Sequence, residues 1–360
     1  MERWEELIKN IEFPIENNIK KTYIWGAGNT AILTHQGMLR ENFYQVFHVV
    51  AYIDKHHAGE LLNGFPVIHP KDITEMKKDD VFILICTQNK STYFEIKSIL
   101  DVLCLSYCTL DAAIMKYRHD YILKAAALFD ERSYKIYSML LEKRLTIDSD
   151  YDNLYAGESY FGISKFCYPR QNDVVIDCGA YVGDSIERYL WRMNSFCKII
   201  AVEPNQGNYM ALCKRFSRLR LEWNLPDDKL IAIHAGVSDK CSTLFLQSKY
   251  GGLGSYSNEY KDNEETQEIT CYAIDDLVQQ YGLQNQVTYI KADVESFEFN
   301  VLNGARKTIA NCKPRLAICI YHNIVDMYSI PLLIHLINPS YHFAVRHHSF
   351  GYEETVLYAY

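Results

Sequence analysis

The chain has 360 residues, of which 48% are hydrophobic and 23% are charged, and its formal net charge is -8. This length and composition are typical of a globular protein with two domains. The acidic balance argues against a nucleic-acid-binding protein, because such proteins neutralise phosphates with Lys and Arg.

The cysteines and the N-terminus indicate the compartment. The eleven Cys residues are irregularly spaced and form no CxxC pair, and Cys86, Cys178 and Cys319 lie inside apolar runs. We therefore expect buried thiols in a reducing compartment, without a disulfide framework or structural zinc. The charged N-terminus MERWEELIKNIEF is not a signal peptide, and no apolar run is long enough to span a membrane. A cytoplasmic protein is expected.

Short apolar strands alternate with helical segments over residues 20–110. The segments YIW, VFHVVAYID and VFILICT are typical of strands, and NTAILTHQGMLREN and STYFEIKSILD are typical of helices. This alternation predicts a parallel sheet with right-handed crossovers. We therefore expect residues 1–110 to form a Rossmann-like domain.

The first glycine turn, YIWGAGNTA, connects a strand to a helix at residues 23–31. Gly26 and Gly28 match the first two glycines of the dinucleotide fingerprint, and Ala31 occupies the third position. Asp54 ends the next strand, where a ribose-binding acid would lie. The sequence leaves two interpretations open, a nucleotide or nucleotide-sugar site and a purely structural turn.

Residues 111–150 have a helical pattern with no strand signal, and we expect one or two connecting helices that could carry a homodimer interface. Residues 151–360 then alternate again and form the second domain. Seven strands are predicted there, and the last two have no room for a helix between them, so they should pair as an antiparallel hairpin. The predicted strand segments are VVIDCG, KIIAVEP, LIAIHAGVSD, TYIKADVE, RLAICIYH, YHFAVRHH and ETVLYAY.

The second glycine turn, DVVIDCGAYVGDS at 173–185, has acids on both sides. Asp177 and Asp184 would repel a phosphate, but they suit a cationic ligand rich in hydroxyl groups. S-adenosylmethionine carries an ammonium, a sulfonium and ribose hydroxyls, and no phosphate. We expect Gly179, Ala180 and Gly183 to let the backbone approach its amino-acid end, with Asp177 ordering that end.

The next two strands end in further polar groups. Glu203 and Pro204 end the second strand, where a carboxylate can accept hydrogen bonds from both ribose hydroxyls. Ser238 and Asp239 end the third strand and could meet the adenine edge. Three acids at three successive strand ends predict an S-adenosylmethionine site.

These motifs resemble the FkbM family of class I S-adenosylmethionine-dependent methyltransferases over about residues 165–360. The resemblance is carried by VVIDCGAYVGDS, AVEPNQGNYMALCKRF, AGVSD, IDDL, YIKADVESFEFNVLNGA and LAICIYH, in this order. Glu295-Ser296 stands where an acid-glycine pair is usual, and Tyr181 where Asn is common. The N-terminal part resembles the Rossmann-like domain of PglD-type sugar O-acyltransferases. The FkbM resemblance implies O-methylation, often of a sugar in a polysaccharide, a glycolipid or a natural product.

In this architecture the strands that end in KADVES and CIYHN lie side by side, next to the transferred methyl group. Asp293, Glu295, Tyr321 and His322 should therefore converge. His322 is the expected general base, with Asp293 next. Alternatively, Glu295 caps the following helix and His322 is a core histidine bonded to backbone. Two carboxylates and a histidine can also hold a divalent metal, and this alternative stays open. We do not expect a metal, because Asp293 and Glu295 alternate along an extended segment and so should face opposite sides.

Two segments could contact the acceptor. QSKYGGLGSYSNEYKDNEET, at 247–266, is rich in Gly, Ser and Tyr and is expected to be a mobile loop over the site, with Gly254 and Ser255 nearest the acceptor. Arg346 lies on the late hairpin and could pair with an acidic group of the acceptor. Tyr321 should contact the acceptor from the cavity wall.

The sequence therefore predicts an O-methyltransferase that acts on a glycan, a glycolipid or a nucleotide-activated sugar, with no nucleic-acid partner and no membrane span. Two alternatives stay open. The chain could bind a nucleotide sugar without catalysis, with a degenerate second domain. It could also be an NAD-dependent enzyme that uses the first glycine turn.

Overall fold

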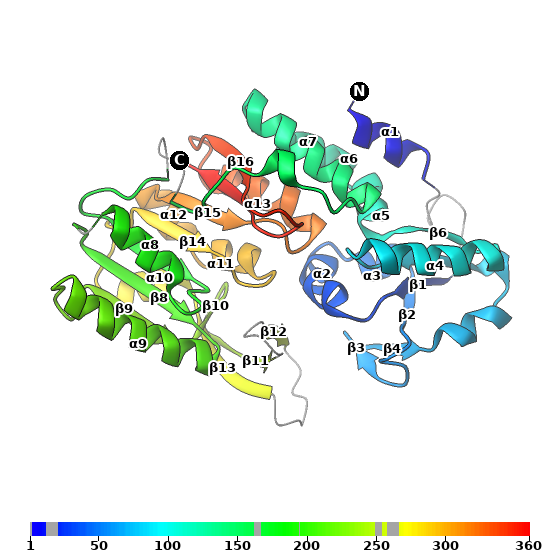
Figure 1. The fold of residues 1–360 in the computed structure, drawn as a ribbon, viewed down its shortest axis with the longest axis horizontal. Helices are drawn as coiled ribbons and strands as arrows, with labels where there is room; N and C mark the ends of the chain where they lie inside the picture. Colours follow the sequence, from blue (N-terminus) through cyan, green and yellow to red (C-terminus); the bar gives the residue numbers. More distant parts are fainter. Residues whose placement is uncertain (1, 12–20, 162–166, 194, 249–253, 258–265) are drawn as a thin grey trace.

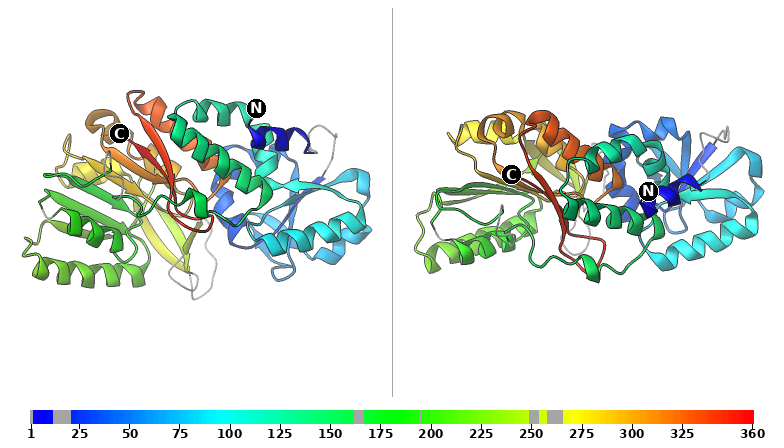
Figure 2. Two further views of the ribbon diagram at one scale, coloured as in Figure 1. Left: turned by 45° about the horizontal axis from the view of Figure 1, so that its top comes forward. Right: turned by 90° about the horizontal axis from the view of Figure 1, so that it is seen from above.

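The computed structural model describes residues 2–11, 21–161, 167–193, 195–248, 254–257 and 266–360, and the statements below refer to these residues. Two α/β units lie at opposite ends of the molecule, with a group of helices packed between them (Figures 1 and 2). No helix in these ranges is both long enough and apolar enough to cross a bilayer.

The N-terminal unit is a Rossmann-like domain built on a six-stranded sheet. Its strand order is β3-β4-β2-β1-β5-β6, and β1 pairs in parallel with both β2 and β5. The strands are β1 (Lys21–Trp25), β2 (Val49–Ile53), β3 (Leu61–Leu62), β4 (Phe65–Ile68), β5 (Val81–Ile85) and β6 (Ser106–Thr109). The helices are α1 (Arg3–Lys9), α2 (Asn29–Arg40), α3 (Phe43–Val46) and α4 (Lys90–Leu103), with short 3₁₀ turns at Pro70–Glu75 and Lys78–Asp80.

The connecting segment forms three helices where the sequence analysis expects one or two. They are α5 (Leu110–Tyr117), α6 (His119–Ala126) and α7 (Glu131–Thr146). The side chains of Thr109 and Asp130 cap α5 and α7 by accepting backbone N–H bonds, which divides a continuous helical pattern into separate helices. A 3₁₀ turn follows at Asp152–Leu154.

The C-terminal unit contains the seven-stranded sheet that the sequence predicts, in the order β16-β17-β15-β14-β7-β8-β9. Four parallel pairings join β9, β8, β7, β14 and β15 in turn. The strand β17 pairs in antiparallel with β15 and with β16, so the predicted terminal hairpin is confirmed. The strands are β7 (Val174–Cys178), β8 (Lys198–Glu203), β9 (Leu230–His234), β14 (Tyr289–Ala292), β15 (Arg315–Cys319), β16 (Phe343–His347) and β17 (Thr355–Ala359). The helices are α8 (Asp184–Arg192), α9 (Gln206–Glu222), α10 (Ile274–Gln280), α11 (Glu298–Asn303), α12 (Arg306–Cys312) and α13 (Ile324–Ile337).

A second, four-stranded sheet lies beside the main one, in the order β10-β13-β11-β12. Its strands are β10 (Gly236–Val237), β11 (Ser242–Ser248), β12 (Gly254–Ser257) and β13 (Thr266–Tyr272). The sequence analysis treats 247–266 as a mobile loop, but part of this segment is the strand β12, paired with β11. Residues 249–253 and 258–265 of that loop lie outside the described residues.

The N-terminal unit contacts the C-terminal unit through α2 and α13. Arg40, at the end of α2, donates to Asp326 at 2.7 Å, and its guanidinium lies 4.1 Å from the ring centroid of Phe299. Gly37 faces the start of α13, where a Cβ atom would come within 2.9 Å of atoms of Asn323 and Val325. The helices α6 and α7 pack on α13 and β16, so the connector is also part of this contact.

Candidate active site

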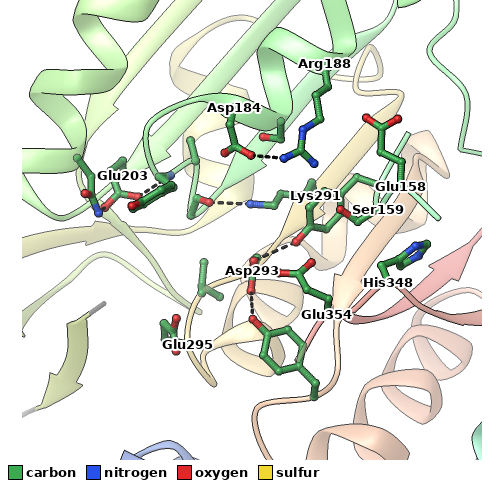
Figure 3. A pocket seen from close by; sticks show the side chains of 18 of the residues that line it. Glu158, Ser159, Asp184, Arg188, Glu203, Lys291, Asp293, Glu295, His348 and Glu354 are labelled. Carbon is green, nitrogen blue, oxygen red and sulfur yellow. Dashed lines mark hydrogen bonds and ion pairs between the residues drawn. The ribbon is translucent and has the colours of Figure 1, made fainter. Parts of the chain in front are cut away.

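A cavity of about 730 Å³ opens at the carboxyl ends of β7, β8, β14 and β15 (Figure 3). This is where ligands bind in open α/β sheets, and the volume lies in the usual range of about 300–1,000 Å³ for small-molecule sites. The cavity is lined by Tyr155, Gly157, Glu158, Ser159, Tyr160, Gly179, Ala180, Tyr181, Asp184, Ser185, Arg188, Glu203, Pro204, Asn205, Asn208, Lys291, Asp293, Val294, Glu295, Tyr321, His348 and Glu354.

The second glycine turn forms one wall. Gly179 has a φ of +73°, and a Cβ atom there would overlap the carbonyl oxygen of Asp293. Only glycine fits this position, because both the left-handed backbone and the closeness of β14 exclude a side chain. Ala180 and Asp184 also line the cavity, and Asp184 pairs with Arg188 at 2.9 Å. Gly183 precedes α8 and faces α9 instead of the cavity.

Asp177 lies behind this wall and does not line the cavity. Its carboxylate accepts a hydrogen bond from Ser185 at 2.8 Å and lies 3.1 Å from the ammonium nitrogen of Lys291. Lys291 stands opposite Asp177 in the pairing of β14 with β7, and its Nζ donates to the carbonyl of Gly179 at 2.6 Å. Asp177 therefore supports the glycine turn indirectly, because it pairs with Lys291 and Lys291 donates to the carbonyl of Gly179. Direct cofactor contact by Asp177 stays a prediction.

Glu203 ends β8 at the opposite side of the cavity from Glu295 (Figure 3). One carboxylate oxygen accepts from the backbone N–H of Tyr181 at 2.8 Å, and the other accepts from Asn205 at 2.9 Å. The oxygen bonded to Asn205 also accepts from the side chain of Asn208 at 3.4 Å. These bonds fix the carboxylate in place, and the oxygen bonded to Tyr181 keeps a lone pair for a further donor. Burial raises the pKa of Glu203, against the effect of these hydrogen bonds. Pro204 lies beside it on the wall.

The structure does not bring Ser238 and Asp239 to the cavity wall. After β9 the chain turns into β10, which belongs to the second sheet, and the backbone N–H of Ser238 bonds to Tyr272 there. The side chain of Ser238 bonds to Asp239. Because the strand pattern runs on without a break from 230 to 239, the sequence gives no sign of this change of sheet.

Asp293 and Tyr321 meet on the wall as the sequence analysis expects. One oxygen of Asp293 accepts from the hydroxyl of Tyr160 at 3.0 Å, and the other accepts from Tyr321 at 3.3 Å. Glu295 and Glu354 lie on the same side of the cavity (Figure 3). This half of the cavity is therefore strongly acidic.

His322 lies behind the wall and does not line the cavity. Its Nε2 is 3.5 Å from Asp293 and 3.7 Å from Glu295, and its Nδ1 is 3.1 Å from Glu298. Burial opposes a charge on the imidazole, but the three carboxylates outweigh it and raise the pKa of His322 to about 10. A protonated imidazole cannot accept a proton, so the expected role of His322 as general base has no support from this arrangement.

The geometric argument against a metal is wrong, because Asp293 and Glu295 face the same imidazole. The strand β14 ends at Ala292, and Glu295 and Ser296 both have a positive φ, 52° and 76°. This left-handed pair breaks the alternation of an extended chain. Glu295 does not cap the next helix either, because the N-cap residue of α11 is Phe297 and no side chain caps this helix. Burial raises the pKa of Glu295 to about 7, with Asp293 and Glu298 adding to the effect.

The residues expected to contact the acceptor lie in different places. Arg346 is buried away from the cavity, where it donates to the hydroxyl of Ser133, and burial lowers its pKa. Its neighbour His348 lines the cavity instead. Gly254 and Ser255 form part of β12, and the structure describes only their backbone.

Several lining residues are absent from the sequence analysis. Glu158, Ser159 and Tyr160 lie in an irregular segment before β7, and Glu354 lies in the turn before β17. Loop residues of this kind carry no periodic signal. Lys291 also lines the cavity, and the sequence places it in the same sheet, inside an otherwise apolar strand where a lysine needs a buried partner.

The first glycine turn is held by Asp54, the acidic residue that follows β2. Asp54 accepts from the backbone N–H of Ala27 at 3.0 Å and from His56 at 2.8 Å. Gly26 is required because a Cβ atom would overlap the carbonyl oxygen of Cys86. A cavity nearby, at the ends of β5 and β6, has a volume of only about 10 Å³, room for about one water. These contacts favour the structural interpretation of Gly26, Gly28 and Asp54.

The sheet order and the cavity at the carboxyl ends of its strands define a methyltransferase-like α/β protein. Residues 177–347 match the family model described as "Methyltransferase FkbM domain". The match supports an FkbM-type methyltransferase domain in this part of the chain, in line with the resemblance. Residues 18–107 match a model described as "C2185-like, N-terminal", and not the PglD-type domain of the sequence expectation.

One solved structure agrees on the fold over nearly the whole chain. The crystal structure of methyltransferase FkbM from Methylobacillus flagellatus KT is 19% identical, with a TM-score of 0.56, and the match covers 99% of this chain and 92% of that one. Fibrillarin from Aeropyrum pernix, solved with natively bound S-adenosyl-L-methionine, is 12% identical, with a TM-score of 0.29 and coverage of 53% and 67%. The latter likeness is too weak to carry an argument. No curated protein matches the chain.

Proposed function

We propose that this protein transfers a methyl group from S-adenosylmethionine to a hydroxyl group of a sugar. The observation that carries the proposal is the charge of the cavity, whose wall includes Glu158, Asp184, Glu203, Asp293, Glu295 and Glu354. Such a wall repels phosphates and suits a ligand with an ammonium and a sulfonium. Together with the FkbM domain, it favours S-adenosylmethionine over a nucleotide.

One part of the cavity suits this cofactor, and another part suits the acceptor. Gly179 and Ala180 would hold the amino-acid end against the backbone, and Glu203 would accept hydrogen bonds from the ribose hydroxyls. Asp293 and Glu295 lie near the acceptor. S-adenosylmethionine would supply a methyl group bonded to a positively charged sulfur.

Methyl transfer to a hydroxyl forms an O–C bond, breaks the C–S bond and releases the hydroxyl proton. We assign the acceptance of this proton to Glu295, because its carboxylate lies on the wall while His322 lies behind it. Asp293, held by two tyrosine hydroxyls, would orient the acceptor oxygen. The exposed, stacked rings of Tyr155 and Phe350 at the rim, 4.5 Å apart, offer an apolar face to a sugar ring.

Titration calorimetry with S-adenosylhomocysteine tests the cofactor site. We expect binding by the unaltered protein and at least tenfold weaker binding by Glu203→Ala, because the ribose hydroxyls lose their acceptor. Glu222→Ala, an exposed change at the end of α9, is the matched control and should bind normally. Equal binding by both variants would remove the assignment of Glu203. A mass-spectrometric screen of sugar acceptors, with Glu295→Gln as the inactive comparison, then tests the transfer to a hydroxyl.

A further inference from the structure

A histidine and three carboxylates meet directly behind the acceptor end of the cavity. Asp293 follows β14, Glu298 begins α11 and His322 follows β15. Glu298 and His322 are buried, with exposed fractions of 0% and 5%, while Asp293 reaches the cavity wall. Three separate elements thus bring potential metal ligands to one point that opens toward the cavity.

The charges at this point do not balance. Three carboxylates face one imidazole, so acidic groups outnumber basic ones at this point. Two cationic side chains of this region are committed elsewhere, Lys291 to Asp177 at 3.1 Å and Arg40 to Asp326 at 2.7 Å. Since buried charges are costly unless they are paired, the excess of carboxylates favours a further cation at this point.

The atoms that face this point lack hydrogen-bond partners. Neither ring nitrogen of His322 makes a hydrogen bond of acceptable geometry within the described chain, and neither does Oε2 of Glu298. All three atoms are buried. In a buried site, atoms in this condition indicate a missing ligand or a strained arrangement.

The spacing of these atoms suits a cation. One ligand atom from each of Asp293, Glu298 and His322 lies within 4.8 Å of the other two, and Nε2 is 3.5 Å from Asp293. Two ligands bound at about 2.1 Å stand about 3.0–3.4 Å apart for bond angles of 90–109°. The observed N···O distance is close to this range and longer than the roughly 2.7–2.9 Å of a charge-assisted hydrogen bond.

We propose that Asp293, Glu298 and His322 bind a divalent cation, with Glu295 within reach as a further oxygen ligand. One nitrogen with two or three oxygens suits Mn²⁺, Fe²⁺ or Zn²⁺ better than Ca²⁺, which takes six to eight oxygens. Because Asp293 lies on the wall, open coordination positions would face the acceptor. The role of the cation in holding an acceptor oxygen rests on the proposed function, but its binding does not.

Mn²⁺ binding to the full-length protein, freed of any histidine tag and treated with EDTA, tests the inference. Electron paramagnetic resonance of free Mn²⁺ should show one ion bound per chain. Asp293→Asn and Glu298→Gln should each weaken this binding at least tenfold, while Asp228→Asn, an exposed and distant carboxylate, should leave it unchanged. No bound ion, or equal affinity in all variants, would overturn the proposal.

A second measurement needs no variant, in case the buried changes prevent folding. Electron spin echo modulation of the bound Mn²⁺ should show coupling to one imidazole ¹⁴N, and absence of this coupling would overturn the assignment of His322. Calorimetry with S-adenosylhomocysteine on the EDTA-treated protein separates the two proposals. Cofactor binding without Mn²⁺ binding refutes only the cation site, and the reverse result refutes only the proposed function.

Discussion

At the scale of single residues, the buried pair of Lys291 and Asp177 has the clearest energetic consequence. Lys291→Met would leave the buried carboxylate of Asp177 without its cation and would free the carbonyl of Gly179. We expect a loss of about 3–5 kcal/mol in the free energy of unfolding, measured by urea denaturation. The double variant Lys291→Met/Asp177→Asn should lose less than the sum of the single changes, and strict additivity would show that the pair does not interact.

The burial of His347 predicts that the protein loses stability in acid. Its ring bonds to the hydroxyl of Thr355 and the carbonyl of Gly351, both at 2.8 Å, beside the ring of Tyr151. Burial lowers the pKa of His347 to about 4. The unfolded chain takes up the proton first, so the stabilising contribution is present above pH 6.5 and is lost as the pH falls toward 4.

Between pH 6.5 and pH 4, protonation of His347 should lower the free energy of unfolding by about 3 kcal/mol. Urea denaturation of the unaltered protein and of His347→Gln at pH 7 and pH 4 measures it. The variant should lose less free energy of unfolding on acidification than the unaltered protein does. The same pH dependence in both proteins would contradict the assignment, and a change at pH 7 alone would reflect only lost packing.

At the scale of elements, the close approach of the second glycine turn to β14 can be separated from its backbone conformation. Gly179→Ala meets both a φ of +73° and the carbonyl of Asp293, whereas Gly282→Ala meets a φ of +66° with open space around it. We expect Gly282→Ala to cost about 1–2 kcal/mol and to leave S-adenosylhomocysteine binding unchanged. Gly179→Ala should cost more and should abolish that binding. Calorimetric titration and thermal melting of both variants measure the difference.

The elements also show what the sequence could predict. The convergence of Asp293 and Tyr321 follows from a general rule, since the ends of adjacent parallel strands meet at one edge of a sheet. This rule does not predict the position of His322, because it gives the edge of the sheet at which a residue lies and not whether its side chain lines the cavity or is buried behind the wall. The left-handed backbone of Glu295 and Ser296 could not be predicted either, because neither residue type favours a positive φ.

At the scale of the whole molecule, the two α/β units and the seven strands of the second one were predictable from the alternation of strands and helices. The contact between the units was not, because it pairs residues almost 300 positions apart, Arg40 and Asp326. Glu158 and Glu354, which reach the cavity from two loops far apart in the sequence, could not be predicted for the same reason. Long-range pairings of loop and helix-end residues have no local sequence pattern.

The contact of Arg40 predicts how the units unfold. Asp326 is fully buried, and Arg40→Met would leave it without a cation, at a cost of about 3–5 kcal/mol. We expect differential scanning calorimetry to resolve two transitions in this variant where the unaltered protein gives one. Arg3→Met, which removes an exposed ion pair with Glu142, is the control and should keep the single transition. A single transition at a lower temperature in Arg40→Met would mean that the helices α6 and α7 suffice to join the units.

The contact of α2 with α13 also limits how this protein can be recombined. Gly37 leaves space for Asn323 and Val325, and Arg40 neutralises Asp326 three residues further along the same helix. A chimera that took its first 110 residues from another Rossmann-like domain would have to keep a glycine and an arginine at these two positions. The front domain is thus an exchangeable part only for donors that carry this pair, and a library of domain swaps should be filtered for it before any clone is made.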